Sequence, residues 1–587
     1  MEIILSDSSK KTFSPISDKL TQENYSTWRH TAMLIIQSLS MEDHLYSSKI
    51  PPQFVTDEAT KTTSESVKYK TWKLQDLTLT TWLVESMTTS IKNKIRNVVD
   101  ALFALGYEVP DSDHIQAIID GLNEDYTVYI GSVMSRLHQV EGIDYDQIYS
   151  PVVRPSTIRV ILTIAVSLNW PLRQFDFDNA FLNGTLNETV YMMQPPGYST
   201  KGEQLVCKLN KAIYGLKQAP RAWYKTLSTT LQQFGFKETR SDVSLFVRFF
   251  DSNVIYLLVY VDDIIVTGNN AAELDKLIYQ LNNIFPLKDM GKFSYFLGLE
   301  ASYLSTGSVH ISQTKYASEL LKRAGMETAN SMPTPMMSNT KLSAHYSEPF
   351  HDPKLYRSIV GALQYLTMTR PDIAFAVNRV SQFMHQPTLL HWKSVKRILR
   401  YVKGTVDHGL LFSKSTDFRL LAFSDADWGG DLDDRKSITG FCVYLGCNLI
   451  SWKSNKQTKV SRSSTEAEYR AMCAAQTELM SIQQLLGELR IPQPMSPTIF
   501  CDNQSACLLA ANPVLHSRCK HLELDLHFLR DLVNQKSLYV VNIPSQDQVA
   551  DSLTKPLSLS LFQKYRFKLR LRDKSCLSLR GSIERTA

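Results

Sequence analysis

Two aspartates, Asp262 and Asp263, stand side by side between two strongly apolar runs of residues. The runs, 254–261 and 264–266, are typical of buried strands, so the sequence predicts a hairpin that carries the two carboxylates at its turn. Neighbouring carboxylates repel each other, and near-buried ones are costly unless they are paired with a cation. A bound divalent metal ion would explain the pair, although aspartate is also common in ordinary hairpin turns.

A further carboxylate lies inside a second apolar segment. Residues 174–181 are typical of a strand in which Asp176 and Asp178 share one face. In-line attack on a nucleotide phosphate requires two Mg²⁺ or Mn²⁺ ions about 4 Å apart, held by carboxylates from separate strands. Asp176, Asp262 and Asp263 fit that requirement, so we expect them to converge in space.

Four more carboxylates belong to four separate predicted elements. Asp425 follows the apolar run 420–423, and Asp502 follows the run 499–501, so each is expected at the end of a short strand. Asp551 lies in a helical context, and a helix that begins near residue 463 supplies a glutamate. Carboxylates from four elements again indicate a site for two divalent ions.

Two glutamates compete for the place on that helix. Ser463 with Glu466 and Thr465 with Glu468 could each form a capping box. Spacing alone therefore leaves open which glutamate is structural and which faces the other carboxylates.

Other metal-binding side chains crowd the same part of the chain and invite a zinc interpretation. They are Cys501, Cys507, His516, Cys519, His521 and His527. Their spacing does not match a closed tetrahedral site, so we do not expect zinc there. Asp427 lies close to Asp425 in the sequence, and we interpret it as a solvated turn residue.

The elements that must position these groups divide the chain into five regions. Residues 1–136 show helical periodicity, and 137–300 alternate β-rich runs with helical segments. Helices are expected to dominate 301–417, and 418–556 form a second α+β region. Residues 557–587 are expected to be a basic, solvated tail. The predicted fold class is therefore an α+β multidomain protein.

Length and composition agree with several folded domains. The chain has 587 residues, 43% hydrophobic and 21% charged, close to the globular average. The longest apolar runs stop at about eight residues, so no membrane span is expected. The N-terminus lacks the features of a secretory signal, and eight cysteines without a C-x-x-C pair do not indicate a disulfide framework. The net charge of +6 permits a nucleic-acid partner without proving one.

Four blocks in order resemble the reverse-transcriptase blocks of copia-type LTR retrotransposon Pol polyproteins. They are the segments 175–184, 191–197, 214–223 and 260–263. The resemblance implies a right-hand polymerase palm within 137–300, followed by a thumb or connection in 301–417. It also implies that Asp176, Asp262 and Asp263 are catalytic ligands of two Mg²⁺ or Mn²⁺ ions.

The same resemblance implies contacts with substrate. Phe181 matches the aromatic steric gate that favours deoxynucleotides, although plain core packing would also explain it. Gln218 matches the block that shapes the nucleotide and template pocket. Phe296 and Gly298 belong to a segment similar to the hairpin that grips the primer end. Lys288 is a candidate proton donor to pyrophosphate, against the commoner role of a solvated surface lysine.

The second acidic group resembles the RNase H domain that follows reverse transcriptase in these elements. The segments 463–469 and 520–523 carry the resemblance, and the family's helix glutamate matches Glu468, which leaves Glu466 to the cap. Such a site uses two metal ions to hydrolyse the RNA strand of an RNA/DNA hybrid. The implied ligands are Asp425, Glu468, Asp502 and Asp551.

The N-terminal region resembles parts of a copia-type Gag polypeptide in 18–28 and 114–122, so 1–136 is expected to be a partial Gag-like helical segment. The zinc-knuckle, protease and integrase motifs that lie between Gag and reverse transcriptase in the family are not found. Near 135–137, where the family has a Lys- and Arg-bearing finger hairpin, only an Arg-Leu pair remains. Because such cations neutralise the incoming triphosphate, we expect impaired polymerisation.

Taken together, these resemblances imply an RNA-directed DNA polymerase with ribonuclease H activity. The expected partners are an RNA template, a DNA primer, RNA/DNA hybrid and dNTPs, with Gag-like self-association and no membrane. The expected location is the cytoplasm, in retroelement particles, with access to the nucleus. Two alternatives stay open: a catalytically decayed Gag/Pol relic that binds nucleic acid or assembles, and a nuclease whose polymerase half is only a scaffold.

Overall fold

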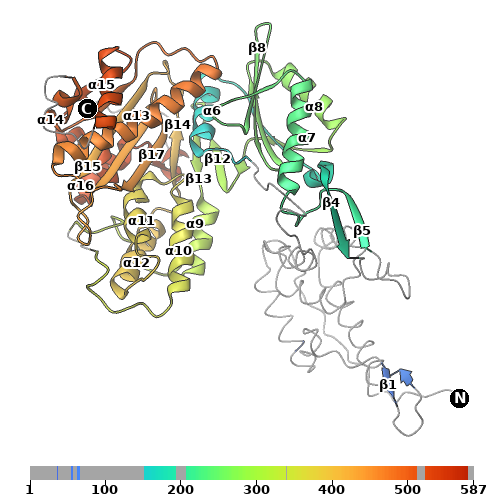
Figure 1. Ribbon diagram of the computed structural model, residues 1–587, viewed down its shortest axis with the longest axis horizontal. Helices are drawn as coiled ribbons and strands as arrows, with labels where there is room; N and C mark the ends of the chain where they lie inside the picture. Colours follow the sequence, from blue (N-terminus) through green and yellow to red (C-terminus); the bar gives the residue numbers. More distant parts are fainter. Residues whose placement is uncertain are drawn as a thin grey trace. The chain divides into compact units, whose positions relative to one another are not determined.

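The computed structural model describes residues 151–193, 206–338, 340, 342–511 and 523–578, with residue 36 and a short antiparallel pair, β1 (Phe54–Thr56) and β2 (Thr63–Glu65) (Figure 1). The chain divides into two compact units. One comprises Met1–Tyr149 with Phe181–Trp223, and the other comprises Ser150–Ala180 with Tyr224–Ala587. The predictions of a Gag-like region in 1–136 and of an absent finger segment near 135–137 concern residues that lie outside the described ones, apart from residue 36 and β1–β2.

The described part of the first unit is built around a two-stranded antiparallel ladder. It contains β4 (Thr185–Met193) and β5 (Val206–Lys211), and it follows the short helix η4 (Ala180–Asn183). Gly184 lies where the ladder meets the start of α7 (Ala219–Gln233), because a Cβ there would lie 2.8 Å from the backbone nitrogen of Trp223. A glycine is therefore required for this close approach.

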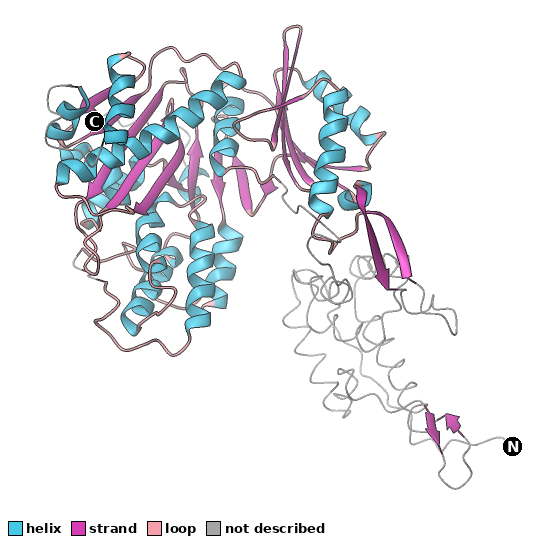
Figure 2. Ribbon diagram, viewed as in Figure 1, coloured by secondary structure: helices cyan, strands magenta, loops and turns pink. Residues whose placement is uncertain are grey.

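The second unit begins with a six-stranded antiparallel sheet in the order β10-β3-β9-β8-β7-β6. Figure 2 draws the strands of the described residues in magenta. The strands are β3 (Leu172–Phe177), β6 (Lys237–Glu238), β7 (Leu245–Phe250), β8 (Asn253–Tyr260), β9 (Asp263–Gly268) and β10 (Leu287–Lys292). Apolar side chains of α6 (Pro155–Ser167) share a core cluster with β7, β8 and β9. The apolar runs seen in the sequence therefore form the central, buried strands of this sheet.

A second sheet of five strands joins segments that are far apart in the sequence. Its order is β11-β12-β13-β14-β20, with every pair antiparallel. The strands are β11 (Tyr295–Phe296), β12 (Leu299–Tyr303), β13 (Val309–Ser312), β14 (His408–Phe412) and β20 (Leu571–Asp573). Four helices complete this region: α9 (Thr314–Arg323), α10 (Pro353–Leu366), α11 (Ala374–Ser381) and α12 (Leu389–Lys403). Within 301–417 the helices are thus accompanied by strands that we did not predict.

The prediction of a basic, solvated tail is wrong for residues 557–578. Part of this segment forms α16 (Leu559–Lys568), in which Phe562 and Tyr565 are buried. The strand β20 that follows pairs with β14, so Leu571 lies opposite Leu410. The basic residues at this end of the chain alternate with apolar ones, and the apolar side chains supply the core contacts.

The third sheet is mixed, in the order β17-β16-β15-β18-β19. Its strands are β15 (Leu420–Asp427), β16 (Ile438–Leu445), β17 (Asn448–Lys456), β18 (Thr498–Cys501) and β19 (Tyr539–Asn542). The pairs β15–β16 and β16–β17 are antiparallel, whereas β15–β18 and β18–β19 are parallel. The long helix α13 (Ser464–Glu488) shares an apolar core with this sheet. The α+β prediction is confirmed.

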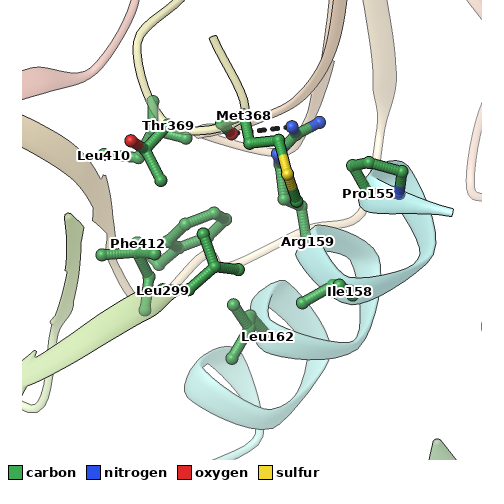
Figure 3. Close-up of a pocket in the computed structure, with 10 residues that line it drawn as sticks. Pro155, Ile158, Arg159, Leu162, Leu299, Met368, Thr369, Leu410 and Phe412 are labelled. Carbon is green, nitrogen blue, oxygen red and sulfur yellow. Dashed lines mark hydrogen bonds between the residues drawn. The ribbon is translucent and has the colours of Figure 1, made fainter. Parts of the chain in front are cut away.

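Helix α6 also connects the three sheets of the second unit. The Arg159 guanidinium donates to the backbone oxygens of Met368, at 2.8 Å, and Ile450, at 2.9 Å. Figure 3 shows the first of these bonds beside a narrow apolar cavity between α6 and the second sheet. The same guanidinium lies 3.8 Å from the ring centre of Trp452 on β17. One side chain therefore joins α6 to two other parts of the unit.

Among the residues that the structure describes, none of the helices has the length and apolarity needed to cross a bilayer.

Candidate functional site

The predicted hairpin turn at 260–263 is present between β8 and β9. Tyr260 ends β8 and lies opposite Asp263, the first residue of β9. Val261 adopts a φ of +56°, which a β-branched residue rarely tolerates. Such strain persists where the surrounding structure enforces it, and it is common at functional sites. The turn thereby holds Asp262 and Asp263 at the end of two buried strands.

Asp176 comes to the same place from β3. It lies directly opposite Asp263 in the β3–β9 ladder, and the Phe177 N–H donates to the Asp262 backbone oxygen at 2.9 Å. The structure therefore brings Asp176, Asp262 and Asp263 together at one edge of the six-stranded sheet. Asp178 lies just beyond the end of β3 and is exposed.

The local electrostatics disfavour a full negative charge in this group. Burial, followed by the neighbouring carboxylates of Asp262 and Asp176, raises the pKa of Asp263 to about 6, against a weak opposing hydrogen bond from Gln174. Burial and the neighbouring carboxylates also raise the pKa of Asp176, and Lys288 partly opposes this effect. Lys288 is exposed and lies opposite Asp176 on β10. Lys288 therefore offsets only part of the negative charge of the three carboxylates, as expected for a site that binds a cation.

The predicted hairpin at 296–300 is also present. Phe296 ends β11 and is buried, Leu299 begins β12, and Leu297 and Gly298 form the turn with φ values of +50° and +68°. The ring of Phe296 lies 6.5 Å from that of Tyr260, so the hairpin lies beside the carboxylate turn.

Phe181 and Gln218 belong to the other compact unit. Phe181 is buried, and its ring centre lies 4.4 Å from that of Tyr214. Gln218 is 2% exposed and immediately precedes α7. Their predicted contacts with a nucleotide therefore stay predictions.

The second acidic group assembles at one end of the mixed sheet. One ligand atom each from Asp425, Asp502 and Asp551 lies within 4.8 Å of the others, and so do atoms of Glu468, Cys501 and Asp502. Because β15 and β18 are parallel neighbours, their carboxyl ends meet at the same edge and bring Asp425 and Asp502 together. Asp551 arrives on the short helix η9 (Val549–Leu553). Among the described residues, only this region brings three such ligand atoms within that distance.

Contacts around α13 separate the two candidate glutamates. Ser463 Oγ accepts from the Glu466 N–H, and the Glu466 carboxylate accepts from the Arg462 N–H and from Arg470, at 2.8 Å each. Glu468 is instead buried beside the acidic group, and the Cys501 thiol donates to it at 3.7 Å. The assignment of Glu466 to the cap and of Glu468 to the cluster agrees with this geometry.

Charge repulsion is strong in the second group as well. Burial, then the charges of Asp425 and Asp502, raise the pKa of Glu468 to about 10. Burial and Asp425 raise the pKa of Asp551 to about 7, and Lys555 opposes this shift. These carboxyl groups would hold protons until a cation replaces them.

Two residues of this site were missed in the sequence. Lys555 Nζ lies 2.9 Å from Asp551 and 3.8 Å from Asp425, and the Thr554 hydroxyl donates to Asp425. The spacing of four between Asp551 and Lys555 was a usable signal for the ion pair, because such residues share a helical face. The contacts with Asp425 are long-range and leave no local pattern.

The interpretation of Asp427 as a solvated turn residue is wrong. It is the last residue of β15 and half-buried, and burial and the charge of Asp425 raise its pKa. Of the residues considered for zinc, His516, Cys519 and His521 lie outside the described residues. Cys501 is buried within the acidic cluster.

Comparisons with known proteins place this geometry in context. Residues 127–338 match a family model described as reverse transcriptase (RNA-dependent DNA polymerase). The chain is 50% identical over 433 residues to the retrovirus-related Pol polyprotein from transposon RE2 of Arabidopsis thaliana, which covers 74% of this chain and 30% of that polyprotein. It is also 33% identical over 297 residues to a putative transposon Ty5-1 protein of Saccharomyces cerevisiae, covering 50% of this chain and 96% of that protein.

Among solved structures, a foamy viral protease-reverse transcriptase in complex with RNA/DNA hybrid aligns with 66% of this chain and 45% of that chain, at 11% identity and a TM-score of 0.37. The chain spans about 30% of the length of the Pol polyprotein that it matches over most of its residues.

Proposed function

This chain belongs to the copia-type retrotransposon Pol polyproteins, and we propose that it joins an RNA-directed DNA polymerase to a ribonuclease H. One observation carries the proposal: two separate carboxylate groups form in one chain, each from elements far apart in the sequence. Asp176 and Asp263 face each other across β3 and β9. Asp425, Asp502 and Asp551 meet at the end of the mixed sheet. The match to the reverse-transcriptase model supports the first assignment.

Divalent ions fit the first group because the carboxyl groups of Asp176 and Asp263 have raised pKa values and the group supplies only oxygen ligands. Oxygen donors suit Mg²⁺ or Mn²⁺. Two bound ions would activate the attacking 3′ hydroxyl and stabilise the leaving pyrophosphate. The protein's own contribution is placement, since Asp176 and Asp263 are fixed on adjacent strands. Lys288, which lies opposite Asp176 in the ladder, would donate a proton to pyrophosphate.

The same fit holds for the second group. Lys555 Nζ contacts both Asp425 and Asp551. A divalent ion would supply positive charge to the same carboxylates, either beside this ammonium group or in place of it. Bound ions there would supply a hydroxide nucleophile and stabilise the leaving oxygen. Asp425, Glu468, Asp502 and Asp551 come from β15, α13, the end of β18 and η9, so the core of this domain fixes their spacing. The proposed substrate is the RNA strand of an RNA/DNA hybrid.

Substrate contacts complete the proposal. The hairpin that contains Phe296 and Gly298 would hold the primer end, and Phe181 would exclude the sugar 2′ hydroxyl. Gln218 would shape the pocket for template and nucleotide. The partners are an RNA template, a DNA primer, RNA/DNA hybrid and dNTPs, with self-association of the Gag-like region. The proposed location is the cytoplasm, within retroelement particles, with access to the nucleus.

Cleavage of a labelled RNA/DNA hybrid in Mg²⁺ tests the ribonuclease half of the proposal. We expect cleavage by the full chain and a loss of at least about a hundredfold in Asp425→Asn, because removing a metal-binding carboxylate removes transition-state stabilisation. Asp417→Asn, in an exposed loop ion pair, is the matched control and should retain activity. A parent chain without cleavage would instead favour a decayed relic that binds nucleic acid or assembles.

Primer extension tests the polymerase half. We propose that extension is slow, by orders of magnitude relative to a complete enzyme, because the cationic finger segment is missing. The residual extension should disappear in Asp262→Asn while hybrid cleavage persists. Rapid extension would show that the missing segment is dispensable, and extension that survives Asp262→Asn would remove that carboxylate from the site.

A further inference from the structure

The turn of the β11–β12 hairpin has a conformation that needs support. Its two turn residues, Leu297 and Gly298, both have positive φ, the pattern of a tight two-residue hairpin loop. Glycine adopts this conformation freely, but leucine does not. The hairpin is only two residue pairs long, Tyr295 with Glu300 and Phe296 with Leu299. A ladder this short gives little stability by itself.

A side chain from α10 supplies that support. The Tyr365 hydroxyl donates to the backbone oxygen of Leu297 at 2.6 Å, across a large sequence separation. The fit is close on the glycine as well, since a Cβ on Gly298 would lie 2.8 Å from the Tyr365 oxygen. The ring of Tyr365 packs edge-on against Tyr316 at 4.8 Å. The hydroxyl is therefore aimed at the turn by a packed ring.

Helix α10 is a rigid base for this contact. One face of the helix, including Tyr356, Leu363 and Leu366, is buried in the core formed with α9, α11 and α12. Asp352 caps its N-terminus by accepting from the Leu355 N–H at 2.9 Å. Tyr365 itself is 37% exposed, so most of the residue is covered by protein.

The supported hairpin continues into the carboxylate turn. Phe296, at the end of β11, packs edge-on against Tyr260, which pairs with Asp263. Burial, and then the nearby phenols of Tyr295, Tyr316 and Tyr260, raise the pKa of Tyr365, in agreement with their convergence. A continuous set of contacts thus runs from α10 through the hairpin to the residues that carry the proposed chemistry.

We propose that Tyr365 is a positioning residue for the polymerase site: its hydroxyl fixes the 296–299 hairpin, and the hairpin sets where the 3′ end of a bound primer lies against the carboxylate turn. This inference rests on the proposed function, in which the hairpin holds the primer end. The side chain acts through the Leu297 carbonyl and need not touch the reacting atoms.

The test measures how the full chain discriminates between two DNA duplexes of equal length. One has a recessed 3′ primer end and the other is blunt, and dissociation rates are measured with a fluorescent label remote from that end. Wild type should release the recessed duplex more slowly. Tyr365→Phe, which removes only the hydroxyl, should reduce this preference about fivefold while the blunt duplex is released at an unchanged rate.

Two further variants sharpen the result. Tyr316→Phe removes the hydroxyl of the neighbouring ring, which donates to the Ala362 oxygen at 3.3 Å. This variant should keep the preference for the recessed duplex. Gly298→Ala disturbs the same turn from the other side of the contact and should reproduce the effect of Tyr365→Phe. Hybrid cleavage by each variant reports whether the chain is folded, because that site lies on the mixed sheet.

The outcomes separate this inference from the proposed function. A wild-type chain with no preference for the recessed end contradicts the proposed polymerase, and the positioning role fails with it. A wild-type preference that Tyr365→Phe retains in full overturns only the role of Tyr365. Loss of preference in Tyr365→Phe and Gly298→Ala, but not in Tyr316→Phe, supports it.

Discussion

Single residues in the second acidic group show how a protein keeps several carboxylates close together. Asp425, Glu468 and Asp551 are all buried. Burial and the neighbouring carboxylates raise the pKa of Glu468 and of Asp551, and one lysine, Lys555, lies close to Asp425 and Asp551. Burying several ionised carboxylates without partners would be prohibitive, so protons or bound cations must offset their charge. A divalent ion would relieve this repulsion by displacing protons.

The pKa of Asp551 leads to a prediction about stability and pH. Its value of about 7 in the folded chain lies above the value of about 3.9 for an unfolded aspartate. A carboxyl group with a raised folded pKa contributes stability that is fully present below the unfolded pKa and is lost as pH rises through the folded pKa. Without metal, Asp551→Asn should therefore gain stability relative to wild type as pH rises from about 4 to about 8.

Thermal unfolding in a chelator, measured for both proteins across this range, checks that prediction. Adding Mg²⁺ should reverse the difference at the upper end, because only wild type keeps the full ligand set. A difference between the two unfolding temperatures that stays constant with pH would contradict the raised pKa.

At the residue scale, the local sequence pattern predicted most of the acidic residues but not the residues that contact them. Asp176, Asp262, Asp425 and Asp502 were predicted because each follows or interrupts an apolar strand. The choice between Glu466 and Glu468 could not be made from spacing, because both fit a capping box. The choice depends on which carboxylate contacts Arg470 and the first turn of the helix, and in the structure this is Glu466. Only the family resemblance favoured Glu468 as the residue of the acidic group.

At the scale of elements, hairpins were predictable and long-range sheets were not. The β8–β9 hairpin depends on two apolar runs that adjoin in sequence, so its pattern is local. The second sheet pairs β14 with β20, and nothing in the sequence between them indicates that pairing. The basic residues near 570 favoured a solvated tail, but Leu571 between them supplies the buried side of the strand β20.

The contact between β16 and η9 gives a prediction at this scale. Gly440 lies opposite Asp425, and a Cβ there would lie 2.6 Å from the Thr554 methyl carbon and 2.8 Å from Leu553 Cβ. Gly440→Ala should push η9 away, lower the free energy of unfolding by about 1–3 kcal/mol and reduce hybrid cleavage, because η9 carries Asp551.

Urea unfolding and a cleavage assay measure both effects. Gly487→Ala is the control, because a Cβ at that position on α13 meets nothing within 4 Å. That variant should be unchanged or more stable by up to about 1 kcal/mol, as helix propensity predicts. Equal behaviour of the two variants would show that η9 adapts to an added methyl group.

At the scale of the whole molecule, α6 links the sheet of the first carboxylate group to the mixed sheet of the second. Arg159 donates to carbonyls at Met368 and Ile450 and stacks on Trp452. In addition, the Tyr256 hydroxyl of β8 donates to the Leu489 oxygen at 2.6 Å, and Ser241 Oγ donates to Glu488 at 3.0 Å. These contacts, within one compact unit, tie the six-stranded sheet and α6 to the mixed sheet and α13.

Arg159→Met tests this coupling. The change keeps an apolar stem but leaves two carbonyls without their donor, so we expect a loss of about 2–4 kcal/mol in the free energy of unfolding. Arg154→Met, at an exposed position at the start of the same helix, should change stability by less than about 0.5 kcal/mol. Equilibrium unfolding should also broaden or separate into two transitions in Arg159→Met, and a small, single-transition effect would argue against coupling through this residue.

The central claim is that two carboxylate groups in one chain bind two separate sets of divalent ions. The most direct measurement is anomalous X-ray scattering from crystals of the full chain grown with RNA/DNA hybrid and Mn²⁺. The account predicts manganese between Asp176 and the 262–263 turn, and again among Asp425, Glu468, Asp502 and Asp551. Manganese absent from both groups, or bound only elsewhere on the chain, would contradict it.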